Sequence, residues 1–273
     1  MDQLEVCEAA ARAGGRVLQE WRGKFAVSKK GPRDLVTEAD LASQREIKRI
    51  VLGAFPDHGF IGEESLPDES VPDVRAVGVT NGDDTIGPSG LRWIVDPLDG
   101  TTNYVHGYPA YCVSVALARG DEVLVGTIYD PVREECFTAR AGGGAFLNGV
   151  RIAVTRTESL SDALVAVGFP PEVTVEAPAV ADFLAVLPHA HAIRRSGSTA
   201  INLASIACGR LDAFWVRRIA SWDVAAGLLL VAEAGGAIGP FAGQPVERVS
   251  LDHPAFIAAC TPGLLEKLRS LMG

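Results

Sequence analysis

A layered fold of mixed α/β (α+β) class is predicted by two features of the sequence. Residues 91–139 contain several short apolar and β-branched segments that are separated by turn signals. Helical patterns lie before and after these segments. A helix or a sheet must bury its apolar side against another element, so strands and helices that interleave along the chain favour stacked layers. The length of 273 residues allows one large domain or two smaller ones.

The individual elements are predicted by local signals. Apolar residues recur at helical spacing over residues 3–21, which predicts an amphipathic helix. Thr37 to Asp40 have the form of a capping box and open a second helix, which Pro56 ends. Residues 66–90 are rich in Pro, Gly, Asp and Ser without periodicity, which predicts a long, mobile loop. Strands are then expected at residues 91–95, 111–118, 122–129 and 133–139, and helices at 198–208 and 222–234.

The charge balance limits the classes of partner. Lys and Arg number 25 and Asp and Glu number 34, so the net charge is −9. Nucleic acids and anionic membranes require clustered basic residues, so we expect neither as a partner. The apolar runs are shorter than the ~20 residues of a membrane span, and the acidic N-terminus is unlike a signal peptide. Five scattered cysteines form neither a disulfide pattern nor a zinc motif, which is typical of a cytoplasmic protein.

The most informative segment reads WIVDPLDGTTN at residues 93–103. An apolar strand reaches Asp96 and then Pro97, which has no N–H for the strand ladder, so we expect the chain to turn there. The turn would bring Asp96 and Asp99 to one side, with the carbonyl of Leu98 between them. Two carboxylates and a carbonyl are hard oxygen ligands that suit Mg²⁺.

Gly100 and Thr101 follow these acids directly. Glycine lets the backbone approach a ligand closely, and a helix that begins at Thr101 would offer free N–H groups to an anion. Metal ligands beside an anion site are what metal-assisted phosphoryl chemistry requires. The alternative interpretation is a surface Asp-Gly turn that follows a buried strand.

Acidic residues elsewhere are candidates for the same site. Glu63 and Glu64 follow a short apolar segment, and Asp223 begins a strongly apolar helix. Taken singly, each has an ordinary explanation: the glutamates as solvated loop residues, and Asp223 as a first-turn acid that stabilises the helix dipole. They indicate a shared metal site only in combination with residues 96–101.

In combination, these segments resemble the inositol monophosphatase family. The resemblance implies a layered α/β/α/β/α sandwich of the sugar-phosphatase type. It implies one domain over residues 1–273, with an N-terminal α+β part at about 1–150 and a C-terminal α/β part at about 151–273. It also implies a homodimer and a lithium-sensitive, Mg²⁺-dependent phosphatase that acts on a small phosphorylated metabolite. The matching pieces are DLVTEAD at residues 34–40, GEES at 62–65, and residues 93–109 and 221–236.

The resemblance also assigns roles to residues at the matching positions. Water would attack the phosphate in line, because Mg²⁺ neutralises the phosphate and lowers the pKa of the water. The implied ligands of two or three Mg²⁺ ions are Glu63, Asp96, the Leu98 carbonyl, Asp99 and Asp223. The residues implied to orient and deprotonate the water are Glu63, Thr101 and Asp40. The implied substrate contacts are Asp99, Gly100, Thr101, Gly197, Ser198, Thr199 and Asp223.

Three positions depart from the family pattern or match it loosely. Lys29 corresponds loosely to a basic residue near the metal loop. The segment 66–92 is longer than usual and is interpreted either as a lid over the site or as a surface insertion. Val216 stands where inositol phosphatases usually carry a Glu that binds ring hydroxyls, so inositol 1-phosphate is not the expected preferred substrate.

The alternatives for the activity follow from this departure. Arg217 and Arg218 are interpreted either as solvated surface charges or as ligands of a second anionic group on the substrate. The second interpretation favours fructose 1,6-bisphosphate, or another sugar, nucleotide or histidinol phosphate handled by the same superfamily. A different class of function is a catalytically weak relative that serves as a regulatory binding module.

Overall fold

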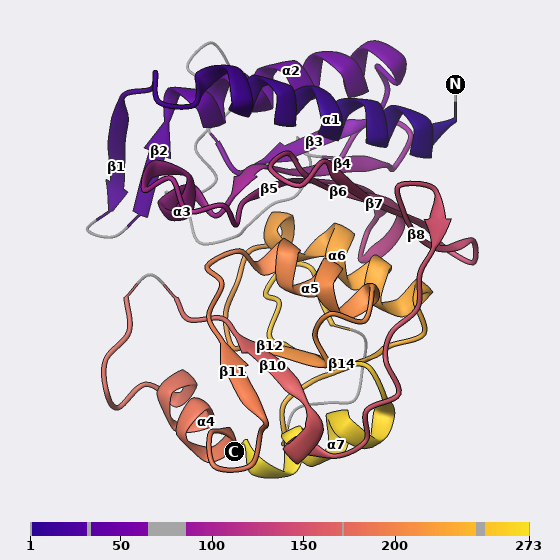
Figure 1. Ribbon diagram of the computed structural model, residues 1–273. Coiled ribbons are helices and arrows are strands. Elements are labelled where there is room, and N and C mark those ends of the chain that lie inside the picture. The colour runs from indigo at the N-terminus through magenta and orange to yellow at the C-terminus, as the bar shows by residue number, and fades with distance from the viewer. Residues whose placement is uncertain (1, 32–33, 65–85, 171, 244–248, 273) are drawn as a thin grey trace.

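Five layers of secondary structure stack in the order helices, sheet, helices, sheet, helices, from top to bottom in Figure 1. The layered α/β/α/β/α class that the resemblance implies is therefore confirmed. The computed structural model describes residues 2–31, 34–64, 86–170, 172–243 and 249–272, except for the side chains of residues 29–31 and 34. Most of the predicted loop at residues 66–92, and the side chain of Lys29, lie outside the described residues.

The helices occupy the outer and middle layers. They are α1 (Gln3–Trp21), α2 (Glu38–Ala54), α3 (Thr101–Val105), α4 (Pro178–Val186), α5 (Thr199–Ala207), α6 (Ser221–Glu233) and α7 (Pro262–Leu271), with a 3₁₀ helix at Leu160–Asp162. α1 and α2 cover the first sheet, α5 and α6 lie between the two sheets, and α4 and α7 cover the second sheet (Figure 1). Among the described residues, none of the helices combines the length and the apolarity that a membrane crossing requires.

The strands form two main sheets and a small hairpin. The first sheet has the order β3 (Gly59–Gly62), β4 (Arg92–Asp99), β5 (Cys112–Arg119), β6 (Glu122–Asp130), β7 (Glu135–Arg140), β8 (Gly144–Leu147) and β9 (Val150–Arg151). The second has the order β11 (Ala192–Arg194), β10 (Leu164–Val167), β12 (Ala213–Val216), β14 (Phe256–Ala259) and β13 (Ala237–Gly239). The hairpin pairs β1 (Val27–Gly31) with β2 (Asp34–Thr37).

The predicted capping box begins α2. The hydroxyl of Thr37 accepts the N–H of Asp40, and the Asp40 carboxylate accepts the N–H of Thr37 at 2.9 Å. The two bonds satisfy backbone groups that a helix start leaves free. The apolar side of α2 then packs on the first sheet through the buried Ile47 and Trp93. The helix therefore holds Asp40 close to the end of β4.

Strand β4 contains a β-bulge at Pro97 instead of the predicted turn. Asp96 pairs with Ser114 and Asp99 with Cys112, so two residues of β4 oppose one residue of β5. Pro97 is tolerated there because a bulge does not need its missing N–H. Side chains alternate between the faces of a strand, so residues three apart normally point to opposite faces. The extra residue of the bulge brings Asp96 and Asp99 to the same face.

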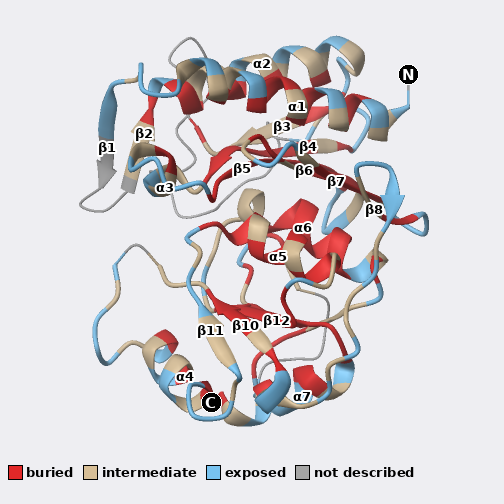
Figure 2. Ribbon diagram, in the orientation of Figure 1, coloured by how far each residue is buried: buried red, intermediate tan, exposed pale blue. Residues whose placement is uncertain are grey.

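The middle helix layer packs closely on this face of the first sheet. Figure 2 shows α5 and α6 as largely buried. Gly126 of β6 lies so close to α6 that an added Cβ would stand 2.9 Å from the Cα of Ala226. The helix start is tied to the sheet as well, because Ser114 of β5 donates its hydroxyl proton to the carbonyl of Trp222 at 3.2 Å. These contacts place the first turn of α6 against the bulge in β4.

The second sheet brings three chain segments to the same edge. β11, β10 and β12 are parallel neighbours, so their carboxyl ends point the same way. β11 leads into the start of α5 at Thr199, and β12 leads into the start of α6 at Ser221. Ligand sites in α/β sheets lie at such edges, where the carboxyl ends of parallel strands meet the N-termini of the following helices.

Candidate active site

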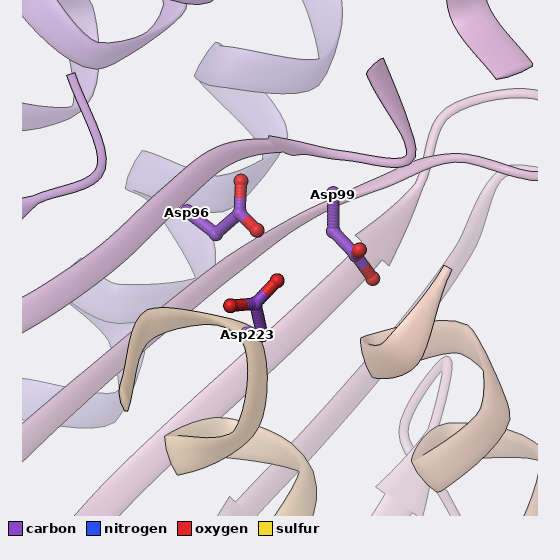
Figure 3. Close-up of side chains that lie close together, drawn as sticks. All are labelled: Asp96, Asp99 and Asp223. Atoms are coloured by element: carbon purple, nitrogen blue, oxygen red, sulfur yellow. The ribbon is translucent and has the colours of Figure 1, made fainter. Parts of the chain in front are cut away.

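Three aspartates from two elements meet between the first sheet and the middle helices. Asp96 and Asp99 come from the bulge in β4, and Asp223 comes from the first turn of α6 (Figure 3). One carboxylate oxygen of each lies within 4.8 Å of the others. Asp96 and Asp99 are buried, and Asp223 is half-buried. The structure thus brings together three acids that the sequence analysis assigned to one site.

The bulge itself is held in place by hydrogen bonds. Asp96 Oδ1 accepts the N–H of Leu98 at 2.9 Å, which spans the bulge at Pro97. On the α2 side, the hydroxyl of Ser43 donates to the carbonyl of Pro97 at 3.0 Å. The Asp223 carboxylate accepts the N–H of Ala220 at 3.2 Å, just before α6. Asp96 and Asp223 are therefore held by bonds to their own local backbone.

The cluster is electrostatically unfavourable when its acids are ionised. Burial, with the nearby carboxylates of Glu63, Asp223 and Asp99, raises the pKa of Asp96 well above its usual range. Burial also raises the pKa of Asp223, again with help from Asp99 and Glu63. Burial raises the pKa of Asp99 to about 6, although its hydrogen bonds oppose the shift. Buried carboxylates that repel one another fit a divalent cation, which would neutralise them and which prefers hard oxygen ligands.

Glu63 is held beside the cluster by its backbone. Its N–H donates to the carbonyl of Val95 at 3.0 Å, which extends the pairing of β3 with β4. The next residue is clamped from α2: the N–H of Glu64 donates to Gln44 Oε1 at 2.8 Å, and Gln44 Nε2 donates to the carbonyl of Glu64 at 2.5 Å. An added Cβ at Gly62 would collide with the amide group of Gln44 and displace it from this clamp. The two glutamates are thus not free loop residues, and Glu64 is buried.

Thr101 connects Asp40 to the bulge. Its hydroxyl lies 3.3 Å from Asp40 Oδ1 and 3.1 Å from the carbonyl of Leu98, and it can donate its proton to either oxygen. Gly100, just before it, has a φ of +97° and would place a Cβ 2.8 Å from the carbonyl of Ala110. Only glycine fits both conditions. Thr101 begins α3 as predicted, and its hydroxyl joins Asp40 to the bulge that carries the acidic cluster.

The predicted alcohol-side segment divides into an exposed and a buried part. Gly197 is exposed, has a φ of +83° and lies against the side chain of Asn103. Asn103 Nδ2 donates to the carbonyl of Ser196 at 2.8 Å, which joins α3 to the loop before α5. Ser198 and Thr199 are buried and bond to Asp99. Their contacts are with the acidic cluster and not with an open surface.

The two arginines after β12 have different environments. Arg217 forms a bidentate pair with the buried Asp182, at 2.5 and 2.8 Å, and lies 4.2 Å from the centre of the Phe241 ring. The interpretation of Arg217 as a solvated charge is therefore wrong, because α4 supplies the buried carboxylate of Asp182 as its partner. Arg218 is exposed, as expected for a solvated charge. Val216 is 1% exposed and packs against Gly168.

Several supporting residues carry no sequence signal. Ser43, Gln44 and Ser114 bond to backbone carbonyls or N–H groups beside the site, across 54, 20 and 108 residues of sequence. Polar residues at such distances belong to no local motif, so they were missed. Asn103 could have been found, since it ends the segment WIVDPLDGTTN.

The layered sandwich and its buried carboxylates define a class of metal-dependent phosphatases. Within this class, the model of the inositol monophosphatase family matches residues 2–272, and the chain belongs to that family. The chain is 41% identical over 258 residues to an inositol-1-monophosphatase of Rhizobium meliloti (strain 1021), which covers 91% of this chain and 90% of the relative. It is 39% identical over 255 residues to the Nus factor SuhB of Xylella fastidiosa (strain Temecula1), at 92% and 86% coverage.

A solved structure shows the same relationship. The extragenic suppressor protein suhB from Bartonella henselae superposes with a TM-score of 0.86 at 34% identity, and the match covers 98% of this chain and 97% of that one. Members of the family hydrolyse phosphate monoesters, so the predicted enzyme class, a phosphoric monoester hydrolase, is confirmed.

Proposed function

We propose that this protein uses Mg²⁺ to hydrolyse a small phosphorylated metabolite by in-line attack of water. The observation that carries the proposal is the cluster of Asp96, Asp99 and Asp223, with carboxylate oxygens within 4.8 Å of one another. Glu63 and the carbonyl of Leu98 complete the proposed ligand set for two or three ions. Bound there, Mg²⁺ supplies neutralisation of the phosphate, acidification of the water and stabilisation of the leaving oxygen.

The proposed handling of the water starts from Thr101 and Asp40. When the Thr101 hydroxyl donates to Asp40 Oδ1, its lone pairs are left to accept a hydrogen from a neighbouring water. Asp40 is fully buried and is held by Thr37 through two further bonds, so its position is well fixed. With Glu63 it would orient the water and take up its proton. Gly100 and Thr101 would receive the phosphate oxygens.

The preferred alcohol is proposed to differ from inositol. Val216 has no acceptor for a ring hydroxyl, and a buried hydroxyl without a partner costs about 1–3 kcal/mol. The alternative of a sugar bisphosphate loses one of its two supporting arginines, because Arg217 is paired with Asp182. Arg218 is the exposed member of the pair that remains for a second phosphate.

A substrate panel with a metal control tests the proposed function. Phosphate release would be measured from inositol 1-phosphate, fructose 1,6-bisphosphate, histidinol phosphate and adenosine 3′,5′-bisphosphate, with Mg²⁺ and with EDTA. We expect Mg²⁺-dependent release from at least one of them. Absence of release from all four would contradict the proposal and favour a regulatory binding module.

The remaining properties are proposals that the same protein can test. We propose a homodimer, lithium inhibition and a single domain over residues 1–273, and the family match supports each of them. A cytoplasmic location agrees with the five free thiols, and the net charge of −9 opposes direct binding of nucleic acid. Light scattering, lithium titration of the activity and a nucleic-acid binding assay would check these points.

A further inference from the structure

The side chain of Ser198 is bonded to a carboxylate of the acidic cluster. Its hydroxyl donates to Asp99 Oδ2 at 2.6 Å. Ser198 is 1% exposed, which is too little for contact with a bound alcohol. The same Oδ2 accepts the N–H of Ala200 at 2.6 Å, while Oδ1 accepts the N–H of Thr199 at 3.3 Å. The Asp99 carboxylate is therefore hydrogen-bonded to the N-terminus of α5.

The two oxygens of Asp99 are used differently. Each carboxylate oxygen has about two acceptor positions. Two short bonds, from Ser198 and Ala200, fill those of Oδ2, whereas Oδ1 has one long bond and keeps acceptor capacity. Loss of the Ser198 bond would remove one of the two short bonds that hold Oδ2, leaving the Ala200 N–H and a long contact from the Cys112 thiol, and would let the carboxylate rotate. The bond therefore selects which oxygen is left for a cation.

The helix fixes the direction in which the Ser198 proton points. Ser198 is the N-cap of α5, and its hydroxyl oxygen accepts the N–H of Ile201 at 3.2 Å. An oxygen that accepts from the helix has its own proton free for Asp99. The thiol sulfur of Cys112 lies 3.8 Å from both the Ser198 hydroxyl and Asp99 Oδ2, so it packs against the hydrogen bond between Ser198 and Asp99. Local capping thus sets the geometry of a proposed metal ligand.

We propose that Ser198 is a positioning residue that orients Asp99 for binding of the divalent cation. This inference rests on the proposed function, since it assumes that Asp99 is a metal ligand. Ser198 acts through Asp99 and does not touch the substrate. Loss of a group that hydrogen-bonds a metal ligand typically lowers metal affinity by about 10- to 100-fold.

Direct binding of Mn²⁺ to the full-length protein tests the inference without an activity assay. Free Mn²⁺ would be followed by its electron paramagnetic resonance signal during titration of the wild type and three variants. We expect Ser198→Ala to raise the Kd about 10- to 100-fold. Ser198→Thr, which keeps the hydroxyl, would restore binding to near the wild-type level. Ser198→Cys keeps the volume with a weak donor, and we expect intermediate binding.

Thr261 offers a matched control. It is the N-cap of α7, is also buried, accepts the N–H of Leu264 at 3.1 Å and donates to the carbonyl of Thr157 at 3.2 Å. Thr261→Ala removes an equivalent cap without contact to Asp99, so we expect a lower melting temperature and unchanged Mn²⁺ affinity. Mn²⁺ affinity of Ser198→Ala or Ser198→Cys equal to wild type would overturn the role of Ser198. A wild type that binds no Mn²⁺ would overturn the proposed function as well.

Discussion

The side chain of Gln44 binds both backbone polar groups of Glu64. Its Oε1 accepts the N–H at 2.8 Å, and its Nε2 donates to the carbonyl at 2.5 Å. The clamp joins α2 to the end of β3, where Glu63 stands. The position of Glu63 therefore depends on a residue that does not touch the proposed metal site.

Replacement of Gln44 is expected to displace Glu63. Gln44→Ala leaves two buried backbone groups of Glu64 without these partners, which costs about 1–3 kcal/mol for each unsatisfied group. We expect a lower midpoint in urea unfolding and a kcat reduced at least about tenfold, since a small misplacement of a reacting group is costly. Arg45→Ala, on the exposed side of the same helix, is the control and should change neither quantity. Normal kcat in a destabilised Gln44→Ala would show that the clamp is structural alone.

Asp96→Asn is expected to separate catalysis from stability. Asp96 is 1% exposed and stands among the carboxylates of Asp99, Asp223 and Glu63. The amide keeps the shape but removes a charge that a metal requires, so kcat should fall by several orders of magnitude. The metal-free variant should melt at a higher temperature than the metal-free wild type, because one repulsive charge is gone. A variant with near-normal turnover would contradict the metal assignment.

The stability of the metal-free protein should fall as the pH rises. Burial raises the pKa of Asp99 from 3.8 to about 6, so the folded state holds this proton more tightly than the unfolded state does. Between about pH 4 and pH 6 the unfolded chain binds fewer protons, and the free energy of unfolding decreases with rising pH. Mg²⁺ binds the ionised form and should restore the lost stability.

Melting curves with EDTA and with Mg²⁺ check this dependence. The difference in melting temperature should be small at about pH 5 and larger at about pH 8. Asp99→Asn supplies the control, because its side chain does not titrate and the difference should shrink. A difference that does not depend on pH would refute the assignment of raised pKa values to the cluster.

The ion pair of Arg217 and Asp182 is expected to contribute to the free energy of unfolding and not to catalysis. Asp182 has a side chain only 3% exposed, so Arg217→Ala would leave a buried charge without this partner. Removal of one partner of a buried pair costs about 3–5 kcal/mol, and the lower half of that range fits because the Arg217 side chain is 23% exposed. Arg218→Ala is the matched control and should stay within about 0.5 kcal/mol. A large loss of kcat/KM in Arg217→Ala for a bisphosphate would restore its assignment to the substrate.

Local signals in the sequence predict most of the helices and strands of the fold. The start of α2 follows from the capping box that begins at Thr37, and the strands follow from short apolar runs between turns. The bulge at Pro97 did not follow, because a proline after a strand fits a turn and a bulge equally well until the pairing with β5 is known. The grouping of the acids was predicted, but the mechanism that groups them was not.

The residues that support the site depend on tertiary contacts. Asp182 lies 35 residues before Arg217, and Gln44 lies 20 residues before Glu64. No periodicity or motif connects such pairs, since their proximity is set by helix packing on the sheets. Ser198 was assigned to the substrate side, and only its burial and its bond to Asp99 indicate another role.

Val216→Glu tests whether this position selects the alcohol. Val216 ends β12, is 1% exposed, and leaves so little room that a Cβ on Gly168 would stand 2.9 Å from its Cγ2. A glutamate is longer than valine and would offer an acceptor to a ring hydroxyl that the buried Val216 side chain does not provide. A hydrogen bond to a charged group contributes about 1.5–3 kcal/mol, so kcat/KM for inositol 1-phosphate should rise by about tenfold or more relative to the other three substrates.

The gain should come with a loss of stability, because part of the new carboxylate enters an apolar environment. Val216→Leu changes the size of the side chain without adding an acceptor and should give no gain for inositol 1-phosphate. Circular dichroism would confirm that both variants fold before their kcat/KM values are compared across the four substrates. Equal relative kcat/KM in Val216→Glu and the wild type would show that the preference for the alcohol is set elsewhere, and the exposed loop at Gly197 would be the next segment to vary.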